Sequence, residues 1–129
     1  MGNRKQGNIT FVGKSGERYP FEVWPLETRF RPLAAVYFVT KRAYGSDTYR
    51  RASHDAIYIG RTEDLAGSLA DPAALARYAK FGANCVCTLV IEGLERGLAV
   101  EQDLLAQYST HCNHRQRAES VFAESGNPG

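Results

Sequence analysis

From Asn8 onward, apolar and polar residues alternate in a pattern typical of strands. Asn8–Val12 and Arg18–Trp24 are strand-like, and Lys14–Glu17 between them has the composition of a turn. These residues predict a β-hairpin. Three later apolar segments, rich in β-branched and aromatic residues, predict further strands: Leu33–Thr40, Ala56–Gly60 and Asn84–Ile91.

Two segments have helical spacing. Asp71-Pro72 is a strong helix start, because aspartate caps the first turn and proline fits the first helical position. Apolar residues follow at helical intervals, and Gly82 suits the exit: Ala74, Leu75, Tyr78 and Phe81. The last clear helix is expected over about Glu95–Tyr108, and at 100° per residue its apolar stripe contains five residues: Leu94, Leu98, Leu104, Leu105 and Tyr108.

Together these elements predict a small α+β domain with a mainly antiparallel sheet flanked by helices. We expect residues 1–129 to form a single domain, with an N-terminal hairpin extension (1–32), a core (33–113) and a polar C-terminal tail (114–129).

Composition is that of an ordinary soluble globular protein, with 43% hydrophobic and 23% charged residues. There is no apolar run of membrane-spanning length and no charged-then-apolar leader, so we expect a cytoplasmic protein without a membrane partner. Three cysteines argue against a disulfide framework. The formal net charge of +2 is too small to indicate a nucleic-acid binder, so local charge must carry that interpretation.

The segment Ala56–Leu69 combines a strand, a glycine and a helix start. Gly60 is expected to end the strand, where the backbone turns or lets another group approach closely. Thr62 can cap a following helix, with Glu63 and Asp64 in its electropositive first turn. Such an arrangement often presents polar groups to a ligand.

Glu101 falls in the middle of the apolar stripe of the last helix. An unpaired carboxylate on a buried face costs several kcal/mol, so it needs a partner, a proton or a metal. Two interpretations stay open: a site residue, or a structural residue that reaches solvent or forms an ion pair.

Several short motifs, in order, resemble the signature of the GIY-YIG nuclease family. Tyr58-Ile59-Gly60 is similar to its second half, and Ala35-Val36-Tyr37 to its first, with Ala35 where the family prefers glycine. Glu101 and Asn113 resemble the family's metal-binding glutamate and late asparagine. The resemblance covers roughly residues 33–113.

The resemblance implies a phosphodiester-cleaving site that uses one divalent metal, Mg²⁺ or Mn²⁺. By this resemblance Glu101 binds the metal, Tyr37 and Tyr58 flank the phosphate, and Asn113 orients or closes the pocket. The family's catalytic arginine should lie ten residues after the second tyrosine, where this chain has Ser68. Serine has neither the charge nor the reach of arginine, so Arg61 or Arg77 would have to substitute.

Three functions are therefore compatible with the sequence. One is a metal-dependent DNA endonuclease with impaired cleavage. Another is a nucleic-acid-binding domain without catalysis, favoured by Ser68 and by the basic segment between residues 41 and 61. The third is a protein-interaction module, favoured by the modest net charge. The residues predicted to contact nucleic acid are all basic: Lys41, Arg42, Arg50, Arg51 and Arg77.

Two further groups of residues have alternative interpretations. His54 is a candidate base in a loop or a surface histidine. Cysteine and histidine ligands could bind zinc if the fold gathers them, but their spacing is not that of a standard zinc finger, and buried thiols are the simpler interpretation: Cys85, Cys87, Cys112 and His114.

Overall fold

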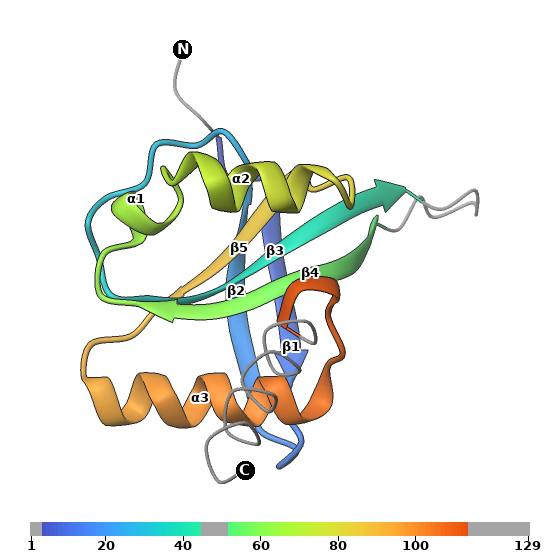
Figure 1. The fold of residues 1–129 in the computed structure, drawn as a ribbon. Coiled ribbons are helices and arrows are strands. Elements are labelled where there is room, and N and C mark those ends of the chain that lie inside the picture. The colour runs from blue at the N-terminus through green and yellow to red at the C-terminus, as the bar shows by residue number, and fades with distance from the viewer. Residues whose placement is uncertain (1–3, 45–51, 114–129) are drawn as a thin grey trace, which may run out of the picture.

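The computed structural model describes residues 4–44 and 52–113 (Figure 1). A five-stranded sheet forms the centre of this part of the chain, with strand order β1-β2-β5-β3-β4 and every neighbouring pair antiparallel. The expected α+β class and the antiparallel sheet are confirmed. In chain order the elements are β1 (Gly7–Val12), β2 (Arg18–Pro25), β3 (Ala35–Tyr44), β4 (Ala52–Thr62), α1 (Leu65–Ser68), α2 (Pro72–Ala79), β5 (Cys85–Val90) and α3 (Leu94–Gln107).

Helices cover both faces of the sheet. Figure 1 shows α1 and α2 on one face and α3 on the other. On the α3 side, Phe38 and Leu104 belong to a cluster of aromatic and aliphatic side chains, in which Phe11 stacks on Phe38 with ring centroids 3.8 Å apart. On the α1/α2 side, Tyr37 packs with Leu65 and other apolar residues. The sheet therefore separates two hydrophobic clusters. No helix in the described ranges is long and apolar enough to cross a membrane.

The predicted hairpin is confirmed as β1 and β2, which pair from Gly7↔Val23 to Val12↔Arg18. Its second strand, β2, joins β5, so the hairpin extends the sheet at the edge opposite β4. Strand β3 lies inside the sheet, and the pleat sends Phe38 to the α3 side and Tyr37 to the other, as the sequence predicts.

A β-bulge at Ile57 changes the alternation in β4. The register shifts where Val39 pairs with Tyr58 and Thr40 pairs with Ala56, so Ile57 is the extra residue. Ile57 and Tyr58 consequently both pack in the α1/α2-side cluster, whereas Ile59 lies on the α3 side. Because directly paired residues share a face, Tyr58 lies on the same face of the sheet as Tyr37.

The prediction that Gly60 ends a strand and that Thr62 caps a helix is wrong. Strand β4 continues to Thr62, and Asp64 is the N-cap of α1, accepting a hydrogen bond from the backbone N–H of Gly67 at 3.1 Å. The Thr62 hydroxyl instead accepts a hydrogen bond from the backbone N–H of Asp64 at 3.0 Å. Pairing with β3 holds residues 60–62 in the sheet, and this tertiary contact outweighs the turn preference of glycine.

Helix α2 begins as predicted, with Asp71 accepting from the backbone N–H of Ala73 at 3.2 Å and Pro72 in the first turn. The extent of α3 is also close to prediction, but its buried face is not. Gly97, Val100 and Leu104 are buried, whereas Leu94 is 55% exposed. Leu98, also predicted in the stripe, is 39% exposed.

Gly97 explains the change of face. A Cβ atom at this position would lie 2.9 Å from Cδ of Arg61, so the absence of a side chain makes room for Arg61 between α3 and β4. The helix therefore turns its glycine, rather than its first two leucines, toward the sheet. Glu101 lies one turn later than Gly97, on the side that faces β4.

Candidate functional site

Three tyrosines from different elements meet on the α1/α2 side of the sheet. Tyr37 comes from β3, Tyr58 from β4 and Tyr78 from α2. The ring centroids of Tyr37 and Tyr58 are 5.9 Å apart, and those of Tyr58 and Tyr78 are 5.4 Å apart. Tyr58 and Tyr78 lie close enough to the Tyr37 hydroxyl to help raise its pKa. The expected proximity of Tyr37 and Tyr58 on adjacent strands is confirmed, and Tyr78 completes a group that the sequence did not reveal.

Gly60 makes room for two of these rings. It pairs with Tyr37 across the sheet, and a Cβ atom there would lie 2.6 Å from Cε2 of Tyr58 and 3.0 Å from Cζ of Tyr37. Real Cβ atoms essentially never come as close as the first contact. The close approach predicted for Gly60 is therefore real, and the approaching groups are the rings of the protein's own site.

The tyrosine cluster forms one wall of an open pocket with a volume of about 440 Å³, which we call the tyrosine pocket. Its other walls are the connection before α1, helix α1 and helix α2. The lining residues are Tyr37, Tyr58, Asp64, Gly67, Ser68, Asp71, Ala74, Arg77 and Tyr78.

Burial keeps these tyrosines protonated. Removal from water raises the pKa of Tyr37 and of Tyr58, and it raises the pKa of Tyr78 to about 12. Arg77 opposes the shift at Tyr58 and Tyr78, because a nearby cation favours the phenolate. At neutral pH the cluster therefore offers neutral hydroxyl groups, which can donate hydrogen bonds to an anion but are poor at taking up a proton.

Ser68 lies at the edge of the tyrosine pocket, as expected of a position one step round the helix from the buried Leu65 and Leu69. Its hydroxyl donates a hydrogen bond to the Thr62 hydroxyl at 2.7 Å. The nearest cation to the tyrosines is Arg77, which is exposed and forms no hydrogen bond or ion pair with the described residues.

Arg61, the other predicted substitute, lies elsewhere. Its side chain is 11% exposed, packs against Gly97 on the α3 side, and has Nη2 3.6 Å from Oε2 of Glu63. Arg61 is absent from the lining of the tyrosine pocket. Of the two arginines, Arg77 is the one that the fold brings to the tyrosines.

Glu101 is half-buried and unpaired within the described residues, since its carboxylate forms neither a hydrogen bond nor an ion pair there. Burial raises its pKa, and the positive charge of Arg61 opposes that shift. The carboxylate is close enough to Tyr58 for its charge to raise the pKa of that hydroxyl. Glu101 therefore interacts electrostatically with Tyr58, although it comes from α3 on the other face of the sheet and does not line the tyrosine pocket.

Asn113 is buried and clamps strand β4. Its Oδ1 accepts the backbone N–H of Ile59 at 2.6 Å, and its Nδ2 donates to the carbonyl of Ile59 at 2.8 Å. The Thr110 hydroxyl also donates to Oδ1 at 2.6 Å. The amide thus imitates a neighbouring strand along the open edge of β4, and both its Oδ1 and its Nδ2 are engaged by Ile59.

The basic residues predicted to contact nucleic acid are only partly placed. Lys41 is exposed and lies over Gly82, whereas Nη1 of Arg42 donates to Oε1 of Gln6 at 2.6 Å. Consecutive strand residues point to opposite faces, so these two cations do not form one patch. Arg50 and Arg51 lie outside the described residues.

The remaining candidate ligands and bases have structural surroundings. His54 lies in β4 rather than in a loop, and its Nδ1 is 2.9 Å from the hydroxyl of the buried Thr40. Burial and the charge of Arg42 lower the pKa of His54. Cys85 and Cys87 belong to the α3-side cluster and Cys112 to the α1/α2-side cluster, so the sheet separates them.

His114, the fourth proposed zinc ligand, lies outside the described residues. Among residues 4–44 and 52–113, no group of three or more histidine, cysteine or acidic side chains is arranged to hold a metal ion.

Tyr78 is the site residue that sequence reasoning missed. Its spacing in α2 predicts burial, and it is buried, but the same spacing is expected of any core aromatic residue. Only its contact with Tyr58 from another element marks it as part of a site. Comparisons with protein-family models, with curated proteins and with solved structures give no match.

Proposed function

We propose that the tyrosine pocket binds a phosphodiester of DNA or another nucleic acid, in a GIY-YIG-type, divalent-metal-dependent endonuclease-like domain whose cleavage is impaired. The observation that supports this most directly is the convergence of Tyr37, Tyr58 and Tyr78 with Arg77 in one open pocket, with the charge of Glu101 acting on Tyr58.

Phosphate oxygens are acceptors, and the pocket supplies donors. Hydroxyl groups that stay protonated can each donate a hydrogen bond, and a nearby arginine adds a charge-assisted one. Arg77 is free to turn toward a bound phosphate because it has no partner among the described residues. The acidic Asp64 and Asp71 are engaged as helix caps, which directs one oxygen of each toward backbone N–H groups.

A divalent metal suits Glu101 if most of its ligands are water. Mg²⁺ often keeps several waters and takes one or two carboxylates together with substrate phosphate oxygens. A half-buried carboxylate without a hydrogen bond or ion pair among the described residues matches that requirement. When bound, Mg²⁺ or Mn²⁺ would polarise the phosphoryl oxygen and lower the pKa of bound water.

Two features support impaired cleavage. Ser68, at the position where the resemblance places arginine, carries no charge, and its hydroxyl is already hydrogen-bonded to that of Thr62. The raised pKa of Tyr37 and Tyr58 makes these hydroxyls poor general bases at neutral pH. Loss of a single electrostatic stabiliser typically costs about 10²–10³ in rate.

The same two features favour a second candidate, a nucleic-acid-binding domain that does not cleave. Binding needs only the hydroxyl donors and Arg77, whereas cleavage also needs a base and the metal. A test must therefore measure cleavage and binding separately.

Nicking of supercoiled plasmid in Mg²⁺ or Mn²⁺ tests the enzyme. Ser68→Arg places a guanidinium at the rim of the tyrosine pocket and is expected to raise metal-dependent nicking by about 10-fold or more. The same substitution in a Glu101→Ala background is expected to give no gain, because the proposed metal ligand is missing. A folded Ser68→Arg variant whose nicking rate does not rise would contradict the proposed endonuclease activity and would leave nucleic-acid binding as the proposed function.

Salt-dependent DNA binding tests the pocket without catalysis. Arg77→Ala is expected to weaken DNA binding and to reduce the slope of log affinity against log salt concentration by the amount expected for about one phosphate contact. Arg18→Ala removes the same charge from an exposed position in β2, away from the tyrosine pocket, and serves as the matched control. Equal effects of the two substitutions would show that DNA does not use the tyrosine pocket.

A further inference from the structure

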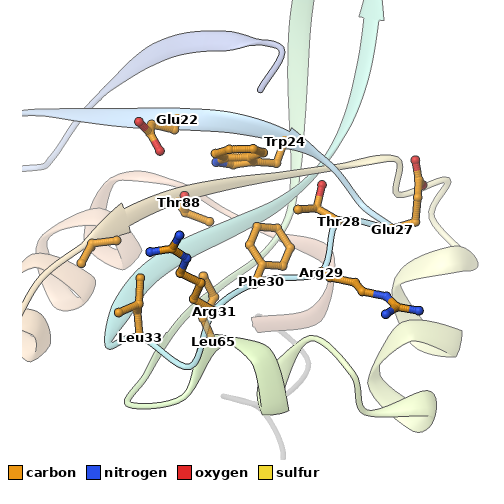
Figure 2. Close-up of a pocket in the computed structure, with 11 residues that line it drawn as sticks. Glu22, Trp24, Glu27, Thr28, Arg29, Phe30, Arg31, Leu33, Leu65 and Thr88 are labelled. Carbon is orange, nitrogen blue, oxygen red and sulfur yellow. The ribbon is translucent and has the colours of Figure 1, made fainter. Parts of the chain in front are cut away.

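A larger pocket opens on the same face of the sheet, between β2, β5 and the connection that follows β2 (Figure 2). Its volume is about 850 Å³, within the usual range for small-molecule sites. We call it the Trp24 pocket, after one of the residues that line it. Neither the GIY-YIG resemblance nor the proposed phosphodiester site uses this pocket.

The walls of the Trp24 pocket combine aromatic rings with two threonine hydroxyl groups that form no hydrogen bond within the described residues. Trp24 and Phe30 lie 6.4 Å apart between ring centroids with an interplanar angle of 80°, so they form a corner with both ring faces and edges available. The Thr88 residue is only 5% exposed, and its hydroxyl, which forms no hydrogen bond with the described residues, reaches the pocket rather than being fully buried. The Thr28 hydroxyl is also buried without a partner.

A buried hydroxyl without a partner is unusual in a folded protein and is normally satisfied by a ligand or water. A ligand for this pocket therefore needs a flat face that stacks on an aromatic ring and an edge that forms hydrogen bonds. A nucleobase has both. An aliphatic side chain would offer no hydrogen bond to the buried Thr28 hydroxyl or to the Thr88 hydroxyl at the pocket wall.

A cation is present for an attached phosphate. Figure 2 shows the Arg31 side chain extending toward the end of the pocket where Thr88 and Glu22 lie, whereas Arg29 extends from the opposite side of Phe30. The side chain of Arg31 forms no ion pair or hydrogen bond within the described ranges, but Glu22 is paired with Lys5 at 3.3 Å. Arg31 is thus the available anion-binding group at this end.

Strand register links the Trp24 pocket to the tyrosine pocket. Thr88 pairs with Tyr37, and Tyr37 pairs with Gly60, so these three residues form one row across β5, β3 and β4. Directly paired residues have Cβ atoms about 5 Å apart. Helix α1 lies between the pockets, with Leu65 lining one and Ser68 the other. One strand of nucleic acid could therefore place a base in the Trp24 pocket and a neighbouring phosphate in the tyrosine pocket.

We infer that the Trp24 pocket binds a nucleobase that carries a phosphate, stacked on Trp24 or Phe30, with Thr88 on the base edge and Arg31 on the phosphate. The inference deepens the proposed function, since it makes a single-stranded or unpaired nucleotide the preferred substrate. The same chemistry could come from a free nucleotide or from a nucleotide within a strand, and the test separates these sources.

Trp24 is the only tryptophan in the chain, so its fluorescence reports on the pocket directly. The intact protein is titrated with adenosine 5′-monophosphate, a single-stranded DNA oligonucleotide, the corresponding duplex and ribose 5-phosphate. We expect saturable quenching by the mononucleotide or the single strand, and little by the duplex or the sugar phosphate. Quenching by the mononucleotide but not by the strand would assign the site to free nucleotides.

Two variants with matched controls test the named contacts. Thr88→Val, which keeps the shape and removes the hydroxyl, is expected to weaken binding by about 5- to 10-fold. Arg31→Gln is expected to weaken mononucleotide binding by a similar factor. Thr10→Val and Arg18→Gln make the same changes at exposed strand positions outside the pocket and are expected to have no effect.

The outcome can be separated from that of the proposed function. Arg77→Ala is expected to weaken DNA binding but to leave quenching by the mononucleotide unchanged. No saturable quenching by either nucleotide form, or equal quenching by ribose 5-phosphate, would overturn the Trp24-pocket inference while DNA binding at the tyrosine pocket persists. Quenching that survives Thr88→Val and Arg31→Gln unchanged would also overturn it.

Discussion

Asn113 provides a sharp test of whether a residue resembling a catalytic one is structural here. Its amide bonds both backbone groups of Ile59 at 2.6 and 2.8 Å. Asn84 makes the same paired contact with Arg42, accepting from its backbone N–H at 2.7 Å and donating to its carbonyl at 3.0 Å. Asn113 is 9% exposed, whereas Asn84 is exposed. The two asparagines therefore differ mainly in access to water.

Replacing each asparagine by alanine should separate the two environments. After Asn113→Ala the N–H and carbonyl of Ile59 are left without a partner where water does not reach easily, and each such group costs about 1–3 kcal/mol. We expect a loss of about 2–4 kcal/mol in the free energy of unfolding, a large part of the roughly 5–15 kcal/mol typical of a domain. After Asn84→Ala water replaces the amide, and we expect at most about 1 kcal/mol.

Equilibrium unfolding in urea, followed by circular dichroism, measures both changes. Thr110→Val removes one donor to the Asn113 amide and the acceptor of the Asn113 backbone N–H, and it should give an intermediate loss, because the contacts to Ile59 remain. Equal losses for Asn113→Ala and Asn84→Ala would refute the burial argument. An Asn113→Ala variant of normal stability but without DNA binding or cleavage would instead favour the role that the GIY-YIG resemblance implies.

Two further substitutions test the tyrosine site and Glu101. Gly60→Ala should lower the free energy of unfolding by about 1–2 kcal/mol, because crowding the rings of Tyr58 and Tyr37 outweighs the strand preference of alanine. In urea unfolding this loss should be smaller in a Tyr58→Ala background, and a Gly60→Ala variant more stable than the wild type would contradict the close contact. Burial holds the pKa of Glu101 above its unfolded value of 4.5, so its ionisation disfavours the folded state as pH rises through that range. Glu101→Gln should therefore stabilise the protein at pH 7 but not below pH 4.5, and a loss of stability at pH 7 would reveal an ion pair with Arg61 instead.

Local sequence patterns determined most of the secondary structure. The hairpin, the strand pattern of β3 and β5 and the Asp71-Pro72 start of α2 were all predicted, because each depends on residues close together in the chain. The face to which each residue of β3 points followed from the alternation of the pleat, and residues 35–40 are buried on both faces.

Contacts between distant residues decided the features that local patterns got wrong. Gly60 continues a strand because β3 pairs with it, and its missing side chain makes room for Tyr37 and Tyr58. The packing of Arg61 against Gly97 sets the face that α3 buries. The helical spacing of apolar residues cannot predict this contact, because Arg61 belongs to a different element.

The candidate site divides in the same way. Motif spacing suggested Tyr37, Tyr58 and Glu101, but the addition of Tyr78 and the choice of Arg77 over Arg61 required the positions of α2 and α3 relative to the sheet. The sequence determined which chemical groups are available. Only tertiary structure decided which of them are close together, which are buried and which still lack a partner, because these properties depend on segments that meet only after the chain has folded.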